Sequence, residues 1–528
     1  MSVRLYIVAA AAVLSAIFLA AKILYIQHDD TVAAAAKNRG QYKISEVREY
    51  ASVYDCKGER LNNTATLYRA VIDPNDDSAL KALPYIVDRE VYNEGITGNL
   101  PFLCTVTQGE IEGVPVIFEK TLRTAEDMPA EHIVGYRSDG EGVCGLEYAY
   151  NKFIRENCSR NTAEYTVNAL GDVLEGLHSD YSQGDSVQAG IVTTIDARIQ
   201  RICESEVEKS GCQSGAVIIM DVKSGEIRAC VSFPRFNPAN PAENLSDENS
   251  PFVNKAFSAY TVGSIFKLVT SAAALESGIS TEYTYNCDGS IDVNGQVFNC
   301  HKWGGHGELD MYEAVEYSCN PYFIALSAYL DGELLHDTAA ALGFGEQTSF
   351  CRGMTSSAGY LPTAAELSVP AEKGNFSFGQ GKLTATPLQI CRMTAAIANN
   401  GMSAAPRLVL ALKSEDGALD EYSYPVNRRV ISYLTARRLR EFMVGTVNAE
   451  NSMSRSNIVS SAGKTSTAQT GRFNSDGSEI MNCWFTGFFP ADSPKYAVTV
   501  LVENGYSGNA TAAPIYKNIA ERITIAEK

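Results

Sequence analysis

Apolar residues form one long run close to the N-terminus of the chain. Residues 5–21 are apolar with one exception, and after Lys22 the run continues as Ile23-Leu24-Tyr25-Ile26. This length matches the ~20 helical residues that cross about 30 Å of hydrocarbon. The pattern predicts a membrane anchor within residues 1–28, and Arg4 places the N-terminus in the cytoplasm. A cleaved signal peptide is the alternative, because small residues follow at 33–36.

Residues 29–185 mix short strand-like and helical pieces with Gly and Pro, and they carry no concentration of reactive side chains. The polar stretch Ser182-Gln183-Gly184-Asp185-Ser186 suits a domain boundary. We therefore expect a separate N-terminal domain over residues 29–185. A second domain is expected over residues 186–528.

From residue 186 onward the apolar pattern becomes regular. Residues 190–195 are strand-like, and Asp196 is placed to cap a helix that ends at Gly211. A hairpin is predicted from strands at 215–222 and 226–233. Two later strands are predicted at 484–489 and 496–502, and a final helix at about 514–527. Helices lying between strands from both ends of the segment indicate an α+β fold, in which helices flank an antiparallel sheet.

Composition and charge narrow the class of protein. The chain has 528 residues, of which 45% are apolar, so it can form two or three domains with a large core. The formal net charge of -18 repels polyanions, and no basic stripe or zinc-finger array offsets it. Nucleic acid is therefore not an expected partner.

The chain has thirteen cysteines, and because this number is odd they cannot all pair in disulfides. Most lie singly in apolar runs, where a small buried thiol is the ordinary role. Cys287 and Cys300 bracket a Gly- and Asn-rich hairpin and are candidates for a disulfide, and the nearby His301 and His306 also allow a zinc site. Because no second close Cys or His pair follows, we expect a disulfide or free thiols there, with no metal and no cofactor.

Ser264-Ile265-Phe266-Lys267 is the stretch most suited to chemistry. Gly263 can turn the backbone sharply, and the apolar run 265–277 predicts a buried helix that Ser264 opens. Lys267 lies three residues on, so its amine stands over the serine hydroxyl. A buried lysine near the positive end of a helix dipole loses its charge more easily, and it can then act as a base toward serine. Ser78 to Lys81 and Ser461 to Lys464 have the same spacing, so this triplet alone is weak.

Two further triplets follow in the chain. Ser318-Cys319-Asn320 offers a hydroxyl beside an amide, although such triplets are usually turns or caps. Lys464-Thr465-Ser466-Thr467 places a cation and hydroxyls on a predicted strand, although a solvated lysine is the ordinary interpretation. The order S-x-x-K, S-x-N, K-T-G is the signature of class A β-lactamases and penicillin-binding proteins.

The chain resembles class B penicillin-binding proteins, the single-pass monofunctional transpeptidases of bacterial wall synthesis. The segment Phe378-Gly379-Gln380-Gly381 and the capping box from Thr386 to Gln389 are similar to that family, as is Trp484-Phe485-Thr486-Gly487. The similarity spans most of residues 40–510, and it implies that residues 29–185 form an elongated N-terminal pedestal domain of dimerisation type. The Cys287 and Cys300 hairpin resembles the branch associated with division and sporulation.

The resemblance implies a role for each residue of the three triplets. Ser264 would attack the carbonyl between two D-alanines of a peptidoglycan stem peptide, and Lys267 would take its proton. Ser318 would pass a proton to the leaving group, Asn320 would hold the substrate amide and fix Lys267, and Lys464 with Thr465 would bind the terminal carboxylate. Backbone N–H groups of Ser264 and Thr467 would form the oxyanion hole, in which each donor contributes about 3 kcal/mol.

The family resemblance also implies partners and a location. β-Lactams would acylate Ser264. The anchor would lie in membrane lipid with the catalytic domain on the extracytoplasmic face of the bacterial membrane, and a membrane glycosyltransferase would supply the glycan strands.

Two positions depart from the family pattern. Ser466 stands where the family has glycine, and its Cβ is expected to narrow the substrate channel and to alter β-lactam affinity. Val262-Gly263 replaces Pro-Gly, which keeps the turn. Two alternative functions remain, namely a serine β-lactamase-type hydrolase and a catalytically weak wall-assembly scaffold.

Overall fold

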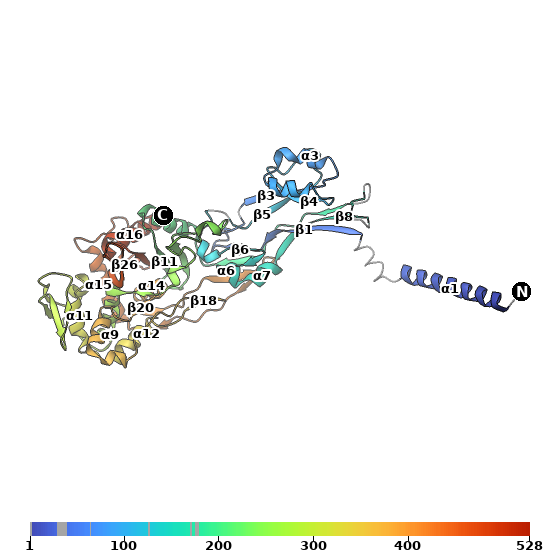
Figure 1. The fold of residues 1–528 in the computed structure, drawn as a ribbon. Coiled ribbons are helices and arrows are strands. Elements are labelled where there is room, and N and C mark those ends of the chain that lie inside the picture. The colour runs from blue at the N-terminus through green and yellow to red at the C-terminus, as the bar shows by residue number, and fades with distance from the viewer. Residues whose placement is uncertain (1–2, 29–39, 64, 125–126, 169–171, 175–178) are drawn as a thin grey trace. The chain divides into compact units, whose positions relative to one another are not determined.

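The computed structural model describes residues 3–28, 40–63, 65–124, 127–168, 172–174 and 179–528 (Figure 1). The chain divides into two units, and its path enters each of them more than once. Unit 1 comprises residues 1–50, 63–123 and 158–187, and unit 2 comprises residues 51–62, 124–157 and 188–528. The last change of unit follows Val187, two residues after the predicted domain boundary, whereas residues 51–62 and 124–157 belong to unit 2.

Helix α1, Val3–His28, begins unit 1. Its segment Tyr6–Ile26 has 21 residues and is, among the described residues, the one helical stretch long and apolar enough to cross a membrane. At about 1.5 Å per residue it spans roughly 30 Å. The helix agrees with the anchor predicted from the apolar run.

The rest of unit 1 consists of two small antiparallel sheets and short helices. One sheet has the order β1-β8-β9 and the other β4-β3-β5. Tyr92 on α4 donates a hydrogen bond of 2.8 Å to the Ala79 carbonyl on α3, which joins the two helices over the second sheet. The bounds are β1 Gln41–Tyr50, β3 Ala65–Ile72, α3 Ser78–Ala82, α4 Arg89–Gly95, β4 Phe102–Val106, β5 Ile117–Leu122, β8 Cys158–Thr166 and β9 Asp180–Ser182.

Unit 2 is organised around a five-stranded antiparallel sheet of order β12-β11-β27-β26-β25. The inner strand β11 is buried along nearly its whole length, because helices cover both faces of the sheet. The strands are β11 Gly215–Asp221, β12 Ile227–Phe233, β25 Ala462–Phe473, β26 Glu479–Phe489 and β27 Tyr496–Glu503. The predicted hairpin, both late strands and the α+β class are confirmed.

Helices α8, Ala197–Ser210, and α16, Ala513–Glu527, cover one face of this sheet. The Asp196 carboxylate caps α8 by accepting from the backbone N–H groups of Arg198 and Ile199 at 3.1 and 3.3 Å. Gly211 ends the helix at a φ of +69°, a conformation that favours glycine. The cap and the stop predicted from the sequence are therefore both confirmed.

Helix α14, Pro387–Ala398, packs against β11, β26 and β27 on the sheet, and every one of its residues is buried. The predicted capping box is present: Thr386 Oγ1 accepts from the N–H of Gln389 at 3.1 Å, and Gln389 Oε1 accepts from the N–H of Thr386 at 2.8 Å. The hydroxyls of Thr394 and Thr486 lie 2.7 Å apart, which satisfies two buried polar groups between helix and sheet.

Two segments from early in the chain join unit 2 through specific contacts. Strand β2, Ser52–Tyr54, pairs in parallel with β10, Gly190–Thr193. The fully buried Glu147 carboxylate accepts hydrogen bonds from Arg137 at 3.1 Å and from Asn62 at 3.2 Å. These long-range contacts explain why the unit boundaries interrupt the N-terminal region.

Unit 2 contains further helices and longer strands outside the five-stranded sheet. They are α5 Glu131–Val134, α6 Gly145–Ala149, α7 Asn151–Glu156, α9 Lys267–Glu276, β14 Tyr285–Cys287, β15 Ser290–Val293, β16 Gln296–Asn299, β17 Gly307–Leu309, α10 Met311–Glu316, α11 Asn320–Ser327, α12 Gly332–Ala341, β18 Ser349–Cys351, α13 Pro370–Ser377, β22 Val409–Lys413, β23 Leu419–Glu421 and α15 Tyr433–Asn448. Two-residue strands lie at β6 Arg137–Ser138, β7 Glu141–Gly142, β13 Tyr260–Thr261, β19 Met354–Thr355, β20 Thr384–Ala385, β21 Met402–Ser403 and β24 Arg428–Arg429.

Candidate active site

Ser264 lies in a tight 3₁₀ turn, Gly263–Phe266, that leads directly into α9. The sequence predicted that Ser264 opens the helix itself; instead the α-helix begins at Lys267. Gly263 has a φ of +66°, and a Cβ built on it would lie 2.4 Å from Ser466 Oγ. Both observations require glycine, so the predicted sharp turn at Gly263 is confirmed. The turn leaves Ser264 partly exposed above a buried helix.

Lys267 is fully buried, and its amine has four polar neighbours. Its Nζ lies 2.9 Å from Ser264 Oγ, 2.6 Å from the Ser318 carbonyl, 3.1 Å from Ser318 Oγ and 2.7 Å from Asn320 Oδ1. The two triplets that contain these residues are more than 50 positions apart in sequence. The structure therefore gathers the first and second triplets around one amine.

The hydrogen-bonding capacities of these neighbours suit a neutral amine. The Ser318 carbonyl and Asn320 Oδ1 can only accept, so they use the two N–H groups of an uncharged amine. Its lone pair is then free to accept a hydrogen bond from the Ser264 hydroxyl. Burial, and next the positive charge of Lys464, hold the pKa of Lys267 well below its usual value, whereas the nearby thiols of Cys319 and Cys300 act in the opposite direction.

Ser318 has an unusual backbone conformation for a residue with a side chain. Its φ of +57° lies in the left-handed region, which costs a non-glycine residue about 1 kcal/mol or more. Cys319 follows in an extended conformation, and Asn320-Pro321 then begins α11. This turn aims both the carbonyl and the hydroxyl of Ser318 at Lys267.

Lys464 approaches the same hydroxyl from β25, the edge strand of the sheet. Its Nζ donates to Ser318 Oγ and to the Thr465 carbonyl, each at 3.2 Å. The side chain is fully buried, and burial lowers its pKa to about 8. The hydroxyl of Ser318 thus lies between two amines, and all three triplets meet at this point.

The three residues after Lys464 alternate along the strand. Thr465 is partly exposed and Thr467 is exposed, with Thr467 Oγ1 accepting from the Gly508 N–H at 3.0 Å. Ser466 is buried instead, and its hydroxyl donates to the Val262 carbonyl at 2.8 Å. The structure therefore places the Ser466 side chain against the nucleophile turn, because alternate strand residues face opposite sides. The altered β-lactam affinity expected from a serine at position 466 stays a prediction.

A positioning contact that sequence reasoning did not identify comes from Gly379. Its carbonyl accepts from the Gly263 N–H at 2.8 Å, and a Cβ on Gly379 would lie 2.0 Å from the Gly263 carbonyl. The glycine spacing of the 378–381 segment was visible in the sequence, but its partner was not. The segment acts as a backbone support for the serine turn.

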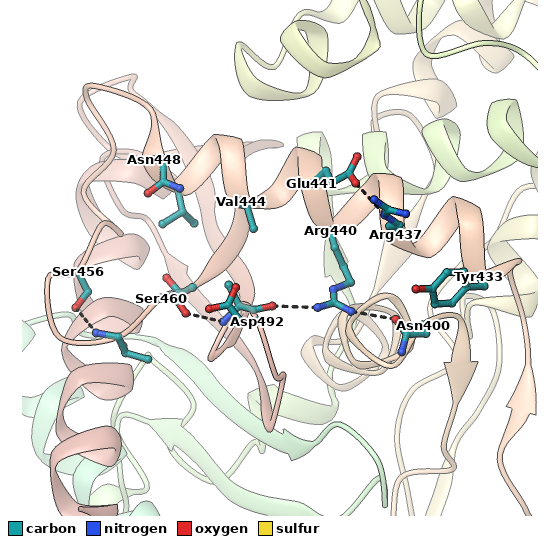
Figure 2. A pocket seen from close by; sticks show the side chains of 14 residues that line it. Asn400, Tyr433, Arg437, Arg440, Glu441, Val444, Asn448, Ser456, Ser460 and Asp492 are labelled. Carbon is teal, nitrogen blue, oxygen red and sulfur yellow. Dashed lines mark hydrogen bonds and ion pairs between the residues drawn. The ribbon is translucent and has the colours of Figure 1, made fainter.

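A separate pocket of about 590 Å³ lies beside α15, and Figure 2 shows the side chains that line it. Arg440 donates to Asn400 Oδ1 at 2.9 Å and to the Ala491 carbonyl at 3.0 Å, while Arg437 pairs with Glu441 at 3.2 Å. None of the described residues that line it belongs to the three triplets. Its arginines already have partners within the protein, so it is not the candidate active site.

Comparisons with known proteins agree with this geometry. Residues 215–521 match the penicillin binding protein transpeptidase domain. Peptidoglycan D,D-transpeptidase PbpA of Mycobacterium tuberculosis is 32% identical over 375 residues, covering 65% of this chain and 74% of the relative. Stage V sporulation protein D of Bacillus subtilis is 30% identical over 412 residues, covering 74% of this chain and 61% of the relative.

Solved structures share the fold. The structure of penicillin-binding protein A from M. tuberculosis, a ceftriaxone acyl-enzyme complex, superposes with a TM-score of 0.67 at 23% identity, covering 90% of this chain and 98% of that one. The family match covers more than half of the chain. The chain therefore belongs to the penicillin-binding protein transpeptidase family, as a class B member.

Proposed function

We propose that the protein is a peptidoglycan D,D-transpeptidase that joins stem peptides through an acyl-serine intermediate. The observation that carries the proposal is the distance of 2.9 Å between Ser264 Oγ and the buried amine of Lys267, whose other contacts suit an uncharged state. Membership of the transpeptidase family supports it. So does the PbpA relative, which is named for this activity.

Acylation begins with transfer of the Ser264 proton to Lys267. Ser264 Oγ attacks the carbonyl of the penultimate D-alanine, an ester bond forms, and the peptide bond to the last D-alanine breaks. The leaving nitrogen takes a proton through Ser318, whose hydroxyl lies 3.1 Å from Lys267 Nζ and 3.2 Å from Lys464 Nζ. General acid and base steps of this kind contribute about 10²- to 10⁴-fold.

The second half-reaction reverses the first with another nucleophile. An amine of a neighbouring stem peptide attacks the ester, a new amide forms, and Ser264 regains its proton. A β-lactam follows the acylation step only: its ring amide opens, and the leaving nitrogen remains tethered to the acyl group. The same serine is therefore the expected site of penicillin attachment.

Substrate positioning falls to Asn320, to β25 and to the nucleophile turn. Asn320 holds the substrate amide, Lys464 with Thr465 binds the terminal carboxylate, and the N–H groups of Ser264 and Thr467 stabilise the developing oxyanion. A donor placed for the transition state is worth about 3 kcal/mol. The contact of Lys464 with Ser318 Oγ supports this arrangement, because it places the cation beside the serine cleft.

The anchor gives the enzyme its place in the cell. Helix α1 spans the bacterial membrane once, and residues 186–528 carry the transpeptidase domain on the extracytoplasmic face. The pedestal is formed by residues 29–185 other than 51–62 and 124–157, which belong to unit 2. A membrane glycosyltransferase supplies the glycan strands. The apolar segment Tyr6–Ile26 and the name of the PbpA relative, a peptidoglycan transpeptidase, support this placement.

Labelling of the full-length protein in detergent with a fluorescent penicillin tests the proposal. We expect one adduct, mapped by mass spectrometry to Ser264 and absent from Ser264→Ala. Release of D-alanine from a peptide ending in D-Ala-D-Ala, with incorporation of an added amine, measures transpeptidation. Rapid nitrocefin turnover would contradict the proposal and indicate a β-lactamase, and an unlabelled, folded wild-type protein would indicate a scaffold.

A further inference from the structure

Four potential metal ligands converge beside the candidate active site in unit 2. The sulfur atoms of Cys287, Cys300 and Cys319 and a ring nitrogen of His306 all lie within 4.8 Å of one another. Cys287 and Cys319 are buried, and Cys300 and His306 are partly buried. We call these four residues the Cys₃His cluster.

The backbone around the cluster is built for close approach. Strands β14 and β17 pair with Cys287 opposite Gly307, so His306 lies beside Cys287 across the pair. The Cys300 N–H donates to the Gly289 carbonyl at 2.8 Å, which closes the β15–β16 hairpin. Gly305 has a φ of +78°, and a Cβ there would lie 1.9 Å from the Cys287 carbonyl. The chain thereby brings Cys300 Sγ to 3.4 Å from His306 Nδ1.

The donor set matches one class of ligand. Tetrahedral zinc sites use bonds of about 2.3 Å to sulfur and 2.0–2.1 Å to nitrogen, which places neighbouring donor atoms roughly 3.8 Å apart. Three thiols with one imidazole, and no carboxylate in the cluster, suit a borderline-soft divalent ion and not magnesium or calcium. Small side-chain movements would shorten the distances of up to 4.8 Å between the donor atoms to this spacing.

We propose that the Cys₃His cluster binds one zinc ion and that this ion fixes the turn Ser318–Asn320. The sequence led us to expect a disulfide or free thiols here and no metal. That expectation weighed only Cys287 and Cys300 with the neighbouring histidines, and it did not include Cys319, the middle residue of the second triplet. A disulfide would use two of the three sulfur atoms and would leave the third thiol and the imidazole beside it without a role.

The position of Cys319 connects the cluster to catalysis, and this half of the inference rests on the proposed function. Its neighbours Ser318 and Asn320 both bond to Lys267 Nζ, at 2.6 to 3.1 Å. The His306 ring also stacks on Tyr317, with centroids 5.8 Å apart and planes 10° apart. A metal bond to Cys319 would hold the strained Ser318 turn from its far end. Zinc binding would release the thiol protons to solvent, and no redox step is involved.

The metal half is tested on the reduced full-length protein in detergent. After exposure to zinc and removal of the excess, we expect about one zinc per chain by mass spectrometry of the metal, as for a closed structural site. Cobalt substitution should give the intense thiolate-to-metal absorption of a tetrahedral site. This spectrum needs no variant, so a folding defect cannot obscure it.

Matched variants identify the ligands. Cys319→Ser and His306→Ala should each lower zinc affinity at least tenfold, whereas Cys212→Ser and His336→Ala, which lie outside the cluster, should leave it unchanged. Absence of stoichiometric zinc, with a Cys287–Cys300 disulfide found by peptide mapping, would overturn the site. Equal zinc affinity in Cys319→Ser would also overturn it.

The rate of penicillin acylation tests the coupling to the turn. We expect chelation to slow acylation at least tenfold and added zinc to restore it, while Cys212→Ser behaves as wild type. If zinc binds stoichiometrically but chelation leaves the rate unchanged, the role in fixing the turn is refuted. If zinc binds and no Ser264 adduct forms in any state, the proposed function fails while the metal site stands.

Discussion

Replacement of Lys464 by glutamine tests how the site keeps Lys267 uncharged. Both amines lie within about 3.2 Å of Ser318 Oγ, so their nitrogen atoms are separated by no more than roughly 6 Å. Two positive charges at ~6 Å repel by about 3 kcal/mol at an effective dielectric constant near 20, so the charge of Lys464 lowers the pKa of Lys267. Glutamine removes this repulsion and nearly preserves side-chain length.

The sign follows from the form of Lys267 that reacts. Lys267 accepts the Ser264 proton only when it is neutral, so the acylation rate falls as the pH drops below the pKa of Lys267. Burial and the Lys464 charge both lower that pKa, and Lys464 itself carries its charge below about pH 8. Without Lys464 the pKa of Lys267 rises, so the acidic limb of the rate profile moves toward higher pH.

The assay is the second-order rate constant for acylation by a fluorescent penicillin, measured from acidic to alkaline pH. Lys464→Arg is the matched control, because it retains the charge and should keep the limb near its wild-type position. Loss of carboxylate binding alone would lower the rate equally at every pH. A Lys464→Gln profile with an unmoved limb would therefore refute the electrostatic coupling.

Three further predictions follow from contacts around the site. Ser466→Ala removes the hydrogen bond to the Val262 carbonyl, so it should destabilise the protein by about 1–2 kcal/mol and lower the Tm by a few degrees. Faster acylation in Ser466→Gly than in the wild type would show that the Ser466 side chain narrows the substrate channel. Gly263→Ala should abolish penicillin labelling because of its φ of +66° and its approach to Ser466 Oγ, and adding Ser466→Gly should restore part of the stability but not all of it. Ser318→Gly should have a free energy of unfolding about 1 kcal/mol higher than Ser318→Ala, because only glycine adopts a φ of +57° without strain. Both variants should transpeptidate 10²- to 10⁴-fold more slowly than the wild type. An alanine variant more stable than the glycine variant would show that the Ser318 backbone is not strained.

The regular apolar pattern was enough to predict the sheet and its flanking helices. Each signal was local: Asp196 capping α8, Gly211 ending it, and the Lys-Ser-Gly turn between the two β-rich runs that form the β11–β12 hairpin. The membership of residues 51–62 and 124–157 in unit 2 was not predictable, because it depends on distant contacts such as the pairing of β2 with β10 and the ion pair of Glu131 with Arg235 at 2.9 Å.

The candidate site shows the same division between local pattern and long-range contact. Ser78 and Lys81 repeat the spacing of Ser264 and Lys267, yet Ser78 Oγ accepts from the Asp73 N–H at 3.1 Å and Lys81 pairs with Asp77 at 4.0 Å. Spacing alone therefore could not distinguish a nucleophile from an ordinary helix start. The order of the three triplets could make this distinction. The left-handed backbone conformation of Ser318 and the burial of the Ser466 side chain against the serine turn, however, appear only in the folded chain.

The position of the Lys267 amine also depends on backbone supports that do not contact it directly. The serine turn is supported by the Gly379 carbonyl at 2.8 Å, and β25 is tied to the same turn by Ser466 at 2.8 Å. The turn at Ser318 is strained, and beside it lies the convergence of Cys319 with three other ligands. Because Lys267 is fully buried, small shifts of any of these supports change its hydrogen bonds and hence its charge. Reactivity in this site is thus a property of backbone placement from three separate elements, and variants outside direct reach of the substrate should alter acylation through the pKa of Lys267.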